Sequence, residues 1–198
     1  MNFLGHAVVA QHGSDAFLLG NLIADGVKGA LPTSGWPSDV IDGMRCHREI
    51  DAWIDHHPAV MALKPRVPPA TRRVAGIGLD MIWDHFLARD MLDPSLQVPE
   101  LQPALMDRVY DTLTEHEALI PPAMKPMFEA LVRERWLESY ARYTTTCHAI
   151  GRIGLRLRGE NRLQQLTPWL IREQALLEAT YHELWPDLLR RATAVKGG

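Results

Sequence analysis

Ionisable side chains interrupt three apolar, helix-patterned stretches in the first half of the chain. They are Asp25, then His47, Asp51 and Asp55, and then Asp80, Asp84 and His85. Residues four apart lie on one face of an α-helix, so the second and third groups can each present side chains in one direction. A carboxylate in apolar surroundings needs a partner, which makes these positions candidates for a site.

Imidazole and carboxylate groups together are suitable ligands for a divalent metal ion. Mn²⁺, Fe²⁺, Mg²⁺ and Zn²⁺ all accept ligands of these kinds, and a helical bundle can supply them from several helices. A bound ion lowers the pKa of water and neutralises charge that builds on a phosphoryl group. The three groups therefore predict a metal site suited to the hydrolysis of a phosphate ester.

A purely structural interpretation accounts for the same residues on spacing alone. His47 and Asp51 could form an ordinary hydrogen-bonded pair on a helix surface. Asp84 with His85 could form a local cap, and Asp25 could cap a helix end before Gly26. Both interpretations therefore remain open at this point.

The hydrophobic pattern predicts an all-α protein, folded as a compact helical bundle. Apolar residues recur with helical spacing and no segment alternates as a strand would. The predicted helical segments are Ala16–Val27, Val40–Ile54, Val74–Leu87, Leu101–Leu113, Met127–Tyr143 and Leu163–Leu189. Three glycines weaken the pattern over residues 144–162. The breaks are short and contain no linker, so residues 1–198 are expected to form a single domain.

The composition of the chain indicates which classes of protein it can belong to. The chain has 198 residues, 46% of them hydrophobic, which is enough for a core without disulfides or a structural metal. Its net charge of −3 is too balanced for nucleic-acid binding over the whole surface. Two cysteines without metal-binding spacing are typical of reduced thiols in the cytoplasm. The chain has no signal-like start and no membrane-length apolar run, so we expect a cytoplasmic protein that does not bind membranes.

Several blocks in the first ninety residues resemble the acyl carrier protein phosphodiesterase family, in the same order. The C-terminal half resembles it only weakly. The matching blocks are Met1-Asn2-Phe3-Leu4 with His6, Gly20-Asn21-Leu22 with Ala24-Asp25, His47-Arg48 with Ile50-Asp51, Thr71-Arg72-Arg73-Val74-Ala75, and Leu79-Asp80 followed by Trp83-Asp84-His85-Phe86-Leu87.

The resemblance implies a fold and a reaction. The family is regarded as an atypical branch of the HD phosphohydrolases, so it implies an HD-domain-like helical fold with a divalent ion, commonly Mn²⁺, with Mg²⁺ or Fe²⁺ as alternatives. The implied reaction is hydrolysis of the phosphodiester that joins 4′-phosphopantetheine to a serine of holo acyl carrier protein. The products would be apo acyl carrier protein and 4′-phosphopantetheine.

The resemblance also implies roles for individual residues. The implied metal ligands are Asp25, His47, Asp84 and His85, although the adjacent pair here runs Asp-His rather than His-Asp. Asp51 and Asp80 would bridge or orient these ligands. His6 would protonate the leaving serine oxygen, or be a buried histidine with a single hydrogen bond. Asn21 would donate to a phosphoryl oxygen or orient Asp25. Arg48, Arg72 and Arg73 would bind substrate phosphate, or pair with carboxylates and solvate the surface.

Because acyl carrier proteins are strongly acidic, such an enzyme should present a basic docking face. Lys64, Arg66, Arg72 and Arg73 occur within ten residues that contain no acid, and residues 133–162 contain seven arginines and three glutamates. The first cluster is the better docking candidate. Two alternatives remain: an HD-like phosphohydrolase acting on a nucleotide, and a non-catalytic helical adaptor that binds acidic proteins through its arginines.

Overall fold

The computed structural model describes residues 2–31, 34–96, 101–157 and 161–194, and within these ranges it contains helices and no strand. This confirms the all-α prediction. The α-helices are α1 (Phe3–Ala10), α2 (Asp15–Ile23), α3 (Ser38–Asp55), α4 (Pro58–Leu63), α5 (Ala75–Leu92), α6 (Ala104–Glu115), α7 (Lys125–Arg133), α8 (Trp136–Ser139), α9 (Tyr143–Arg156), α10 (Thr167–Arg172) and α11 (Gln174–Ala194). Five short 3₁₀ turns join them: η1 (Ala24–Gly26), η2 (Lys64–Arg66), η3 (Pro69–Val74), η4 (Glu117–Leu119) and η5 (Leu163–Leu166).

The two longest predicted helices are each divided in the structure. Residues 127–143 form α7 and α8, because Arg135 takes a left-handed conformation with φ of 48° between them. Residues 163–189 form η5, α10 and α11. In the stretch where glycines weakened the pattern, residues 144–156 are instead helical, as part of α9, while Gly159 lies outside the described residues. A Cβ on Gly154 would lie 3.1 Å from Leu163 Cβ, so the glycine allows α9 to pack closely on η5.

The first helix, α1, is buried almost throughout and was not among the predicted segments. Asn2 provides no side-chain cap at its start. The carboxylate of Asp84, on α5, accepts hydrogen bonds from the backbone N–H groups of Leu4 at 2.8 Å and Gly5 at 2.9 Å. These are two of the N–H groups that a helix start leaves without an internal partner. A side chain eighty residues away thus completes the helix.

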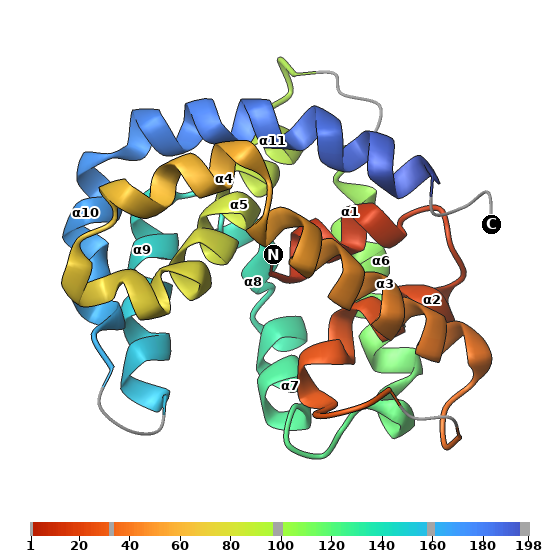
Figure 1. The fold of residues 1–198 in the computed structure, drawn as a ribbon. Helices are drawn as coiled ribbons and strands as arrows, with labels where there is room; N and C mark the ends of the chain where they lie inside the picture. The colour runs from red at the N-terminus through yellow and green to blue at the C-terminus, as the bar shows by residue number, and fades with distance from the viewer. Residues whose placement is uncertain (1, 32–33, 97–100, 158–160, 195–198) are drawn as a thin grey trace.

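Helices α2 and α3 cross at a glycine pair. A Cβ on Gly20 would lie 2.1 Å from Val40 O, and one on Gly43 would lie 2.2 Å from Phe17 O. Only residues without a side chain allow the two backbones to come this close. The crossing brings the residues that follow Gly20 against those that follow Gly43 (Figure 1).

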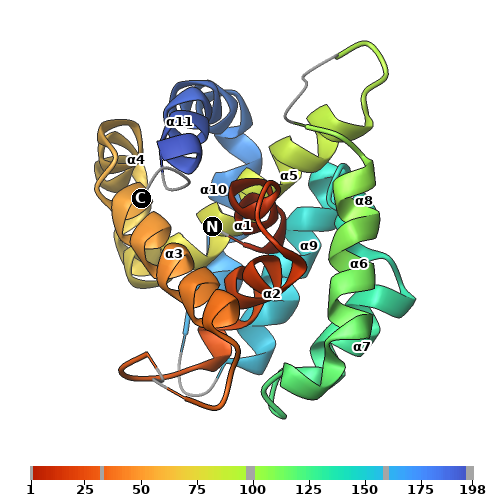
Figure 2. The same cartoon turned by 90° about the vertical axis from the view of Figure 1, so that its right-hand side faces the viewer.

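The buried hydrophobic residues form one core, to which helices from both halves of the chain contribute. Figure 2 shows α1 in the middle of the molecule, with α3 on one side and α6 on the other. Among the described residues, no helix combines the length and the apolar character that a membrane crossing requires.

Candidate metal centre

Three side chains from two helices converge at one point. The potential ligand atoms of His6 on α1 and of His47 and Asp51 on α3 all lie within 4.8 Å of one another. Asp51 contacts both imidazoles: Oδ1 lies 3.1 Å from His6 Nε2, and Oδ2 lies 3.1 Å from His47 Nε2. The two rings are stacked, with centroids 3.7 Å apart. The spacing of His47 and Asp51 correctly predicted that they share a face of the helix.

The orientation of His47 leaves one ring nitrogen available as a ligand. Its Nδ1 lies 2.7 Å from the backbone oxygen of Asn21. Because a carbonyl can only accept, Nδ1 must carry the hydrogen, and Nε2 faces the carboxylates. Histidines that bind metals usually donate their second N–H to a carbonyl or carboxylate in this way. The Gly20–Gly43 crossing is what brings Asn21 within reach of His47.

His6 forms the buried floor of the group. The residue is 1% exposed, and among the described residues neither ring nitrogen finds a hydrogen bond of good geometry, although Nε2 is close to Asp51. Buried polar atoms are seldom left without a partner. An imidazole nitrogen that faces a carboxylate and a second imidazole fits a metal ligand.

Asp25 approaches the group from η1. Its Oδ1 lies 3.3 Å from His47 Nε2, and its side chain is 74% exposed, so it lies at the solvent edge. Arg48 fixes the segment that follows Asp25, because its guanidinium donates to Val27 O at 2.6 Å and Gly29 O at 2.7 Å. Arg48 was expected to bind substrate phosphate or to pair with a carboxylate, but in this structure it binds these two backbone carbonyls.

The close packing changes the pKa of each member of the group. Burial lowers the pKa of His6 to about 4, and the nearby positive charge of His47 adds to this effect. Burial would also lower the pKa of His47, but hydrogen bonds to Asp25 and Asp51 outweigh it and raise the pKa to about 9. The hydrogen bond from His47 lowers the pKa of Asp25. Burial opposes ionisation of Asp51, but the hydrogen bond from His47 and the close contact with His6 hold its pKa well below the usual range. At neutral pH, without an ion, His6 is therefore neutral, His47 is charged and both carboxylates are ionised, so an ion would take the place of the proton on His47 Nε2.

The structure does not bring Asp84 and His85 into this group. Both carboxylate oxygens of Asp84 are engaged by the start of α1. His85 Nδ1 lies 2.7 Å from Tyr140 O, and its ring packs against Tyr143. Adjacent residues on an α-helix point about 100° apart, so Asp84 and His85 face different neighbours. Asp80, one turn before Asp84, is half-buried, and burial raises the pKa of its carboxyl.

The other predicted residues have structural partners or remain at the surface. The amide of Asn21 donates to Phe17 O in its own helix, so it is the backbone of Asn21 that contacts the site. Arg72 folds back onto Val67 O and Pro65 O, and Arg73 is exposed. In the second arginine-rich stretch, residues 158–160 and the side chain of Arg156 lie outside the described residues.

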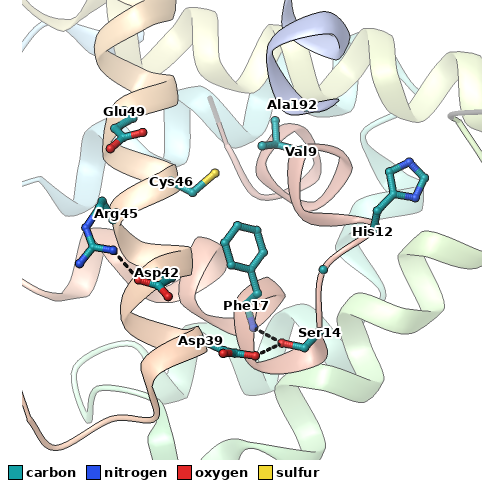
Figure 3. A pocket seen from close by; sticks show the side chains of 11 residues that line it. Val9, His12, Ser14, Phe17, Asp39, Asp42, Arg45, Cys46, Glu49 and Ala192 are labelled. Atoms are coloured by element: carbon teal, nitrogen blue, oxygen red, sulfur yellow. Dashed lines mark hydrogen bonds and ion pairs between the residues drawn. The ribbon is translucent and has the colours of Figure 1, made fainter. Parts of the chain in front are cut away.

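A cavity of about 600 Å³ lies on another side of α3, away from the His6, His47 and Asp51 group (Figure 3). Its walls include Phe17, Cys46, Glu49 and Ala192, and none of the predicted site residues lines it. Burial raises the pKa of the Cys46 thiol to about 11, so the thiol is not activated. Nothing in the cavity resembles the convergence of groups around His6.

Comparison with known proteins agrees with the blocks seen in the sequence. A family described as acyl carrier protein phosphodiesterase matches residues 1–188. A protein named acyl carrier protein phosphodiesterase from Enterobacter sp. (strain 638) is 44% identical over 142 residues, which cover 71% of this chain and 70% of that protein. Proteins of the same name from Serratia proteamaculans (strain 568) and Klebsiella pneumoniae (strain 342) are 31% and 32% identical over 194 residues, 97% of each chain.

No solved structure matches this chain, so the HD-domain-like fold remains an expectation. The family match spans nearly all of the described helices, including α6 to α10, where the sequence blocks gave little guidance. It identifies the chain as a hydrolase of phosphodiesters. Together with the full-length relatives, it shows that the chain belongs to the acyl carrier protein phosphodiesterase family.

Proposed function

We propose that this chain is a divalent-metal-dependent enzyme that hydrolyses the phosphodiester between 4′-phosphopantetheine and a serine of holo acyl carrier protein. The products would be apo acyl carrier protein and free 4′-phosphopantetheine. Family membership supports the class of reaction. The observation that supports metal dependence is the buried His6 imidazole, which has no well-formed hydrogen bond within the described part of the chain and faces His47 and Asp51.

Four side chains would hold the ion. They are His6, His47 and Asp51, with Asp25 at the solvent edge. Mixed nitrogen and oxygen ligands fit Mn²⁺, which we take as the first candidate, and Fe²⁺ or Mg²⁺ as alternatives. When bound, the ion would supply a lowered pKa for water and neutralisation of phosphoryl charge.

The residues themselves define the rest of the site. Asp51 spans the two imidazoles and so fixes their separation, and Asn21 O fixes the tautomer of His47. With a pKa of about 4, His6 is a neutral imidazole at neutral pH and not the imidazolium that would protonate the serine oxygen, so metal binding is its better role. Asp80 replaces it as our candidate donor, since burial raises the pKa of its carboxyl and it is electrostatically coupled to Asp51.

The acidic carrier protein would dock on the cluster formed by Lys64, Arg66, Arg72 and Arg73. Two of these cations are committed within the chain: Lys64 donates to Asp55 O, and Arg72 donates to Val67 O and Pro65 O. The side chains of Arg66 and Arg73 are exposed and are the better candidates for contacts with a partner. The cluster leads directly into α5, the helix that carries Asp80.

Mass spectrometry of holo acyl carrier protein tests the proposal. Protein freed of metal by a chelator should leave the carrier unchanged, and added Mn²⁺ should cause loss of the prosthetic group. His47→Ala should abolish that loss. His56→Ala is the matched control, because the exposed His56 imidazole bonds to Ala52 O in the last turn of α3, away from the proposed ligands.

Two results would overturn the proposal. Turnover of a nucleotide without release of 4′-phosphopantetheine would indicate the nucleotide phosphohydrolase. Stoichiometric binding of the carrier, unaffected by chelator or by His47→Ala, would indicate the non-catalytic adaptor.

A further inference from the structure

A second cavity, of about 450 Å³, opens between α8 and α9, and Met81 of α5 also lines it. Helices α8 and α9 both pack against α5 (Figure 1). Its volume is within the range of pockets that hold small organic ligands. We call it the α8–α9 groove.

The start of α1 connects the α8–α9 groove to the candidate metal centre. Asn2, at the start of α1, donates from Nδ2 to Met81 Sδ at 3.0 Å. The same residue accepts, at its backbone oxygen, the N–H of His6 at 3.3 Å. One turn of helix, about 5.4 Å, therefore separates the residue that contacts the groove wall from the histidine of the metal centre.

The lining of the groove combines apolar walls with hydrogen-bonding groups. Met81, Trp136 and Ala149 supply apolar surface, and Thr145, His148 and Arg152 supply donors. Arg152 is exposed and forms no salt bridge with any carboxylate among the described residues. Its charge is therefore available to a ligand, and an apolar groove with a few polar groups is the usual form of a small-molecule site.

We infer that the α8–α9 groove binds the pantetheine arm of the substrate while the phosphodiester lies at the metal centre. This inference rests on the proposed function. The arm is a flexible chain with apolar methyl and methylene groups, a hydroxyl and two amides. Its apolar groups match the walls, and its amide oxygens can accept hydrogen bonds from Arg152 and Thr145. The arm extends from the phosphate, so it must occupy a groove that begins beside the site.

Two variants test the groove by opposite changes. Ala149→Phe fills it, and Arg152→Ala removes its cation. Each should lower kcat/KM for release of 4′-phosphopantetheine from holo acyl carrier protein by about tenfold or more. Arg142→Ala is the control, because Arg142 is exposed at the start of α9 and does not line the groove. It should stay within about twofold of the unchanged protein.

Binding of free pantetheine provides a readout that needs no turnover. Pantetheine should shift the NMR signal of the Trp136 indole in the unchanged protein, and less so in Arg152→Ala. This measurement also covers the case in which Ala149→Phe does not fold, which its melting curve would show. If the unchanged protein releases no 4′-phosphopantetheine, the proposed function is wrong. The pantetheine titration alone then decides whether the groove binds pantetheine. If release occurs but Arg152→Ala and a folded Ala149→Phe retain full kcat/KM, the inference about the groove is wrong.

Discussion

Among single residues, the spacing rules succeed where partners share one helix and fail where an orientation depends on a distant segment. His47 and Asp51 are four apart on α3, and both contact the same point, as predicted. Asp84 and His85 are adjacent, so their side chains diverge. What Asp84 binds is decided by α1, which lies eighty residues earlier in the chain. Sequence alone could therefore identify the candidate ligand types but could not select the final set.

Arg48 gives a prediction about positioning. Arg48→Ala removes the hydrogen bonds that hold Val27 O and Gly29 O, in the segment that follows Asp25. It should weaken Mn²⁺ binding by about tenfold, because the loss of a residue that orients a ligand usually has an effect of this size. The fold should be retained, and calorimetric titration measures the affinity. Arg45→Ala is the control, since Arg45 pairs with Asp42 at the surface. Equal affinities for the two variants would contradict the positioning role.

Asp84 gives a prediction about pH. Burial raises the pKa of its carboxyl to about 7, although hydrogen bonds from Leu4 and Gly5 oppose the shift. The folded protein therefore holds a proton that the unfolded chain has already released, so stability should fall as pH rises. The slope should be about 1.4 kcal/mol per pH unit between pH 5 and pH 7, and should level off above that.

The Asp84 prediction is checked by urea unfolding with a chelator present. The change Asp84→Asn removes the titrating group, so the difference in unfolding free energy between the two proteins isolates it. As pH rises, the unfolding free energy of the unchanged protein should fall relative to that of Asp84→Asn. A difference that stays constant across this range would contradict the raised pKa.

Among elements, α1 shows most clearly what the sequence could not predict. Its eight residues include Gly5, Val8 and Val9, which are poor helix formers, and isolated helices this short are marginal in water. Burial and the Asp84 carboxylate stabilise it instead. The α2, α3, α5 and α6 segments were predictable because each has a long apolar pattern of its own. The break at Arg135 was not, because nothing local signals a left-handed residue there.

The α2–α3 crossing predicts an effect of adding one methyl group. Gly43→Ala would place a Cβ 2.2 Å from Phe17 O, so the helices must separate. We expect a loss of about 2 to 3 kcal/mol in stability and weaker Mn²⁺ binding, because separation moves Asn21 O from His47. Gly76→Ala is the matched control: a Cβ there meets nothing within 4 Å.

Chemical denaturation measures both glycine variants. Gly76→Ala, on an exposed helical position, should be neutral or stabilising by up to about 1 kcal/mol, since alanine favours the helix. If Gly43→Ala were as stable as Gly76→Ala, the close crossing would not be the feature that holds the two helices in register.

In the whole molecule, the groups proposed for chemistry come from the first half of the chain, while much of the groove beside them comes from α8 and α9 of the second half. The groove itself had no sequence signal, because Met81, Trp136 and Ala149 are ordinary apolar residues until three helices meet. The family match over residues 1–188 includes both the proposed ligands in the first half and the groove helices α8 and α9 in the second.

Metal binding should stabilise the whole fold. The proposed ligands come from α1, η1 and α3, so an ion bound to them links three segments that separate on unfolding. At a free Mn²⁺ concentration about a hundredfold above the dissociation constant, the gain should be about 2.7 kcal/mol, seen as a higher melting temperature. His47→Ala should lose this gain and His56→Ala should keep it. A melting temperature unaffected by Mn²⁺ in the unchanged protein would contradict the metal centre.

The cap that Asp84 places on α1 also bears on how the protein is made. Synthesis proceeds from the N-terminus, at about 5 to 20 residues per second. All four proposed ligands leave the ribosome before Asp84 does, yet the helix that carries His6 lacks the partner for its first N–H groups until α5 follows. The nascent chain therefore contains every proposed ligand before α1 can be fixed in position. The packing of α5 against α1 completes the site.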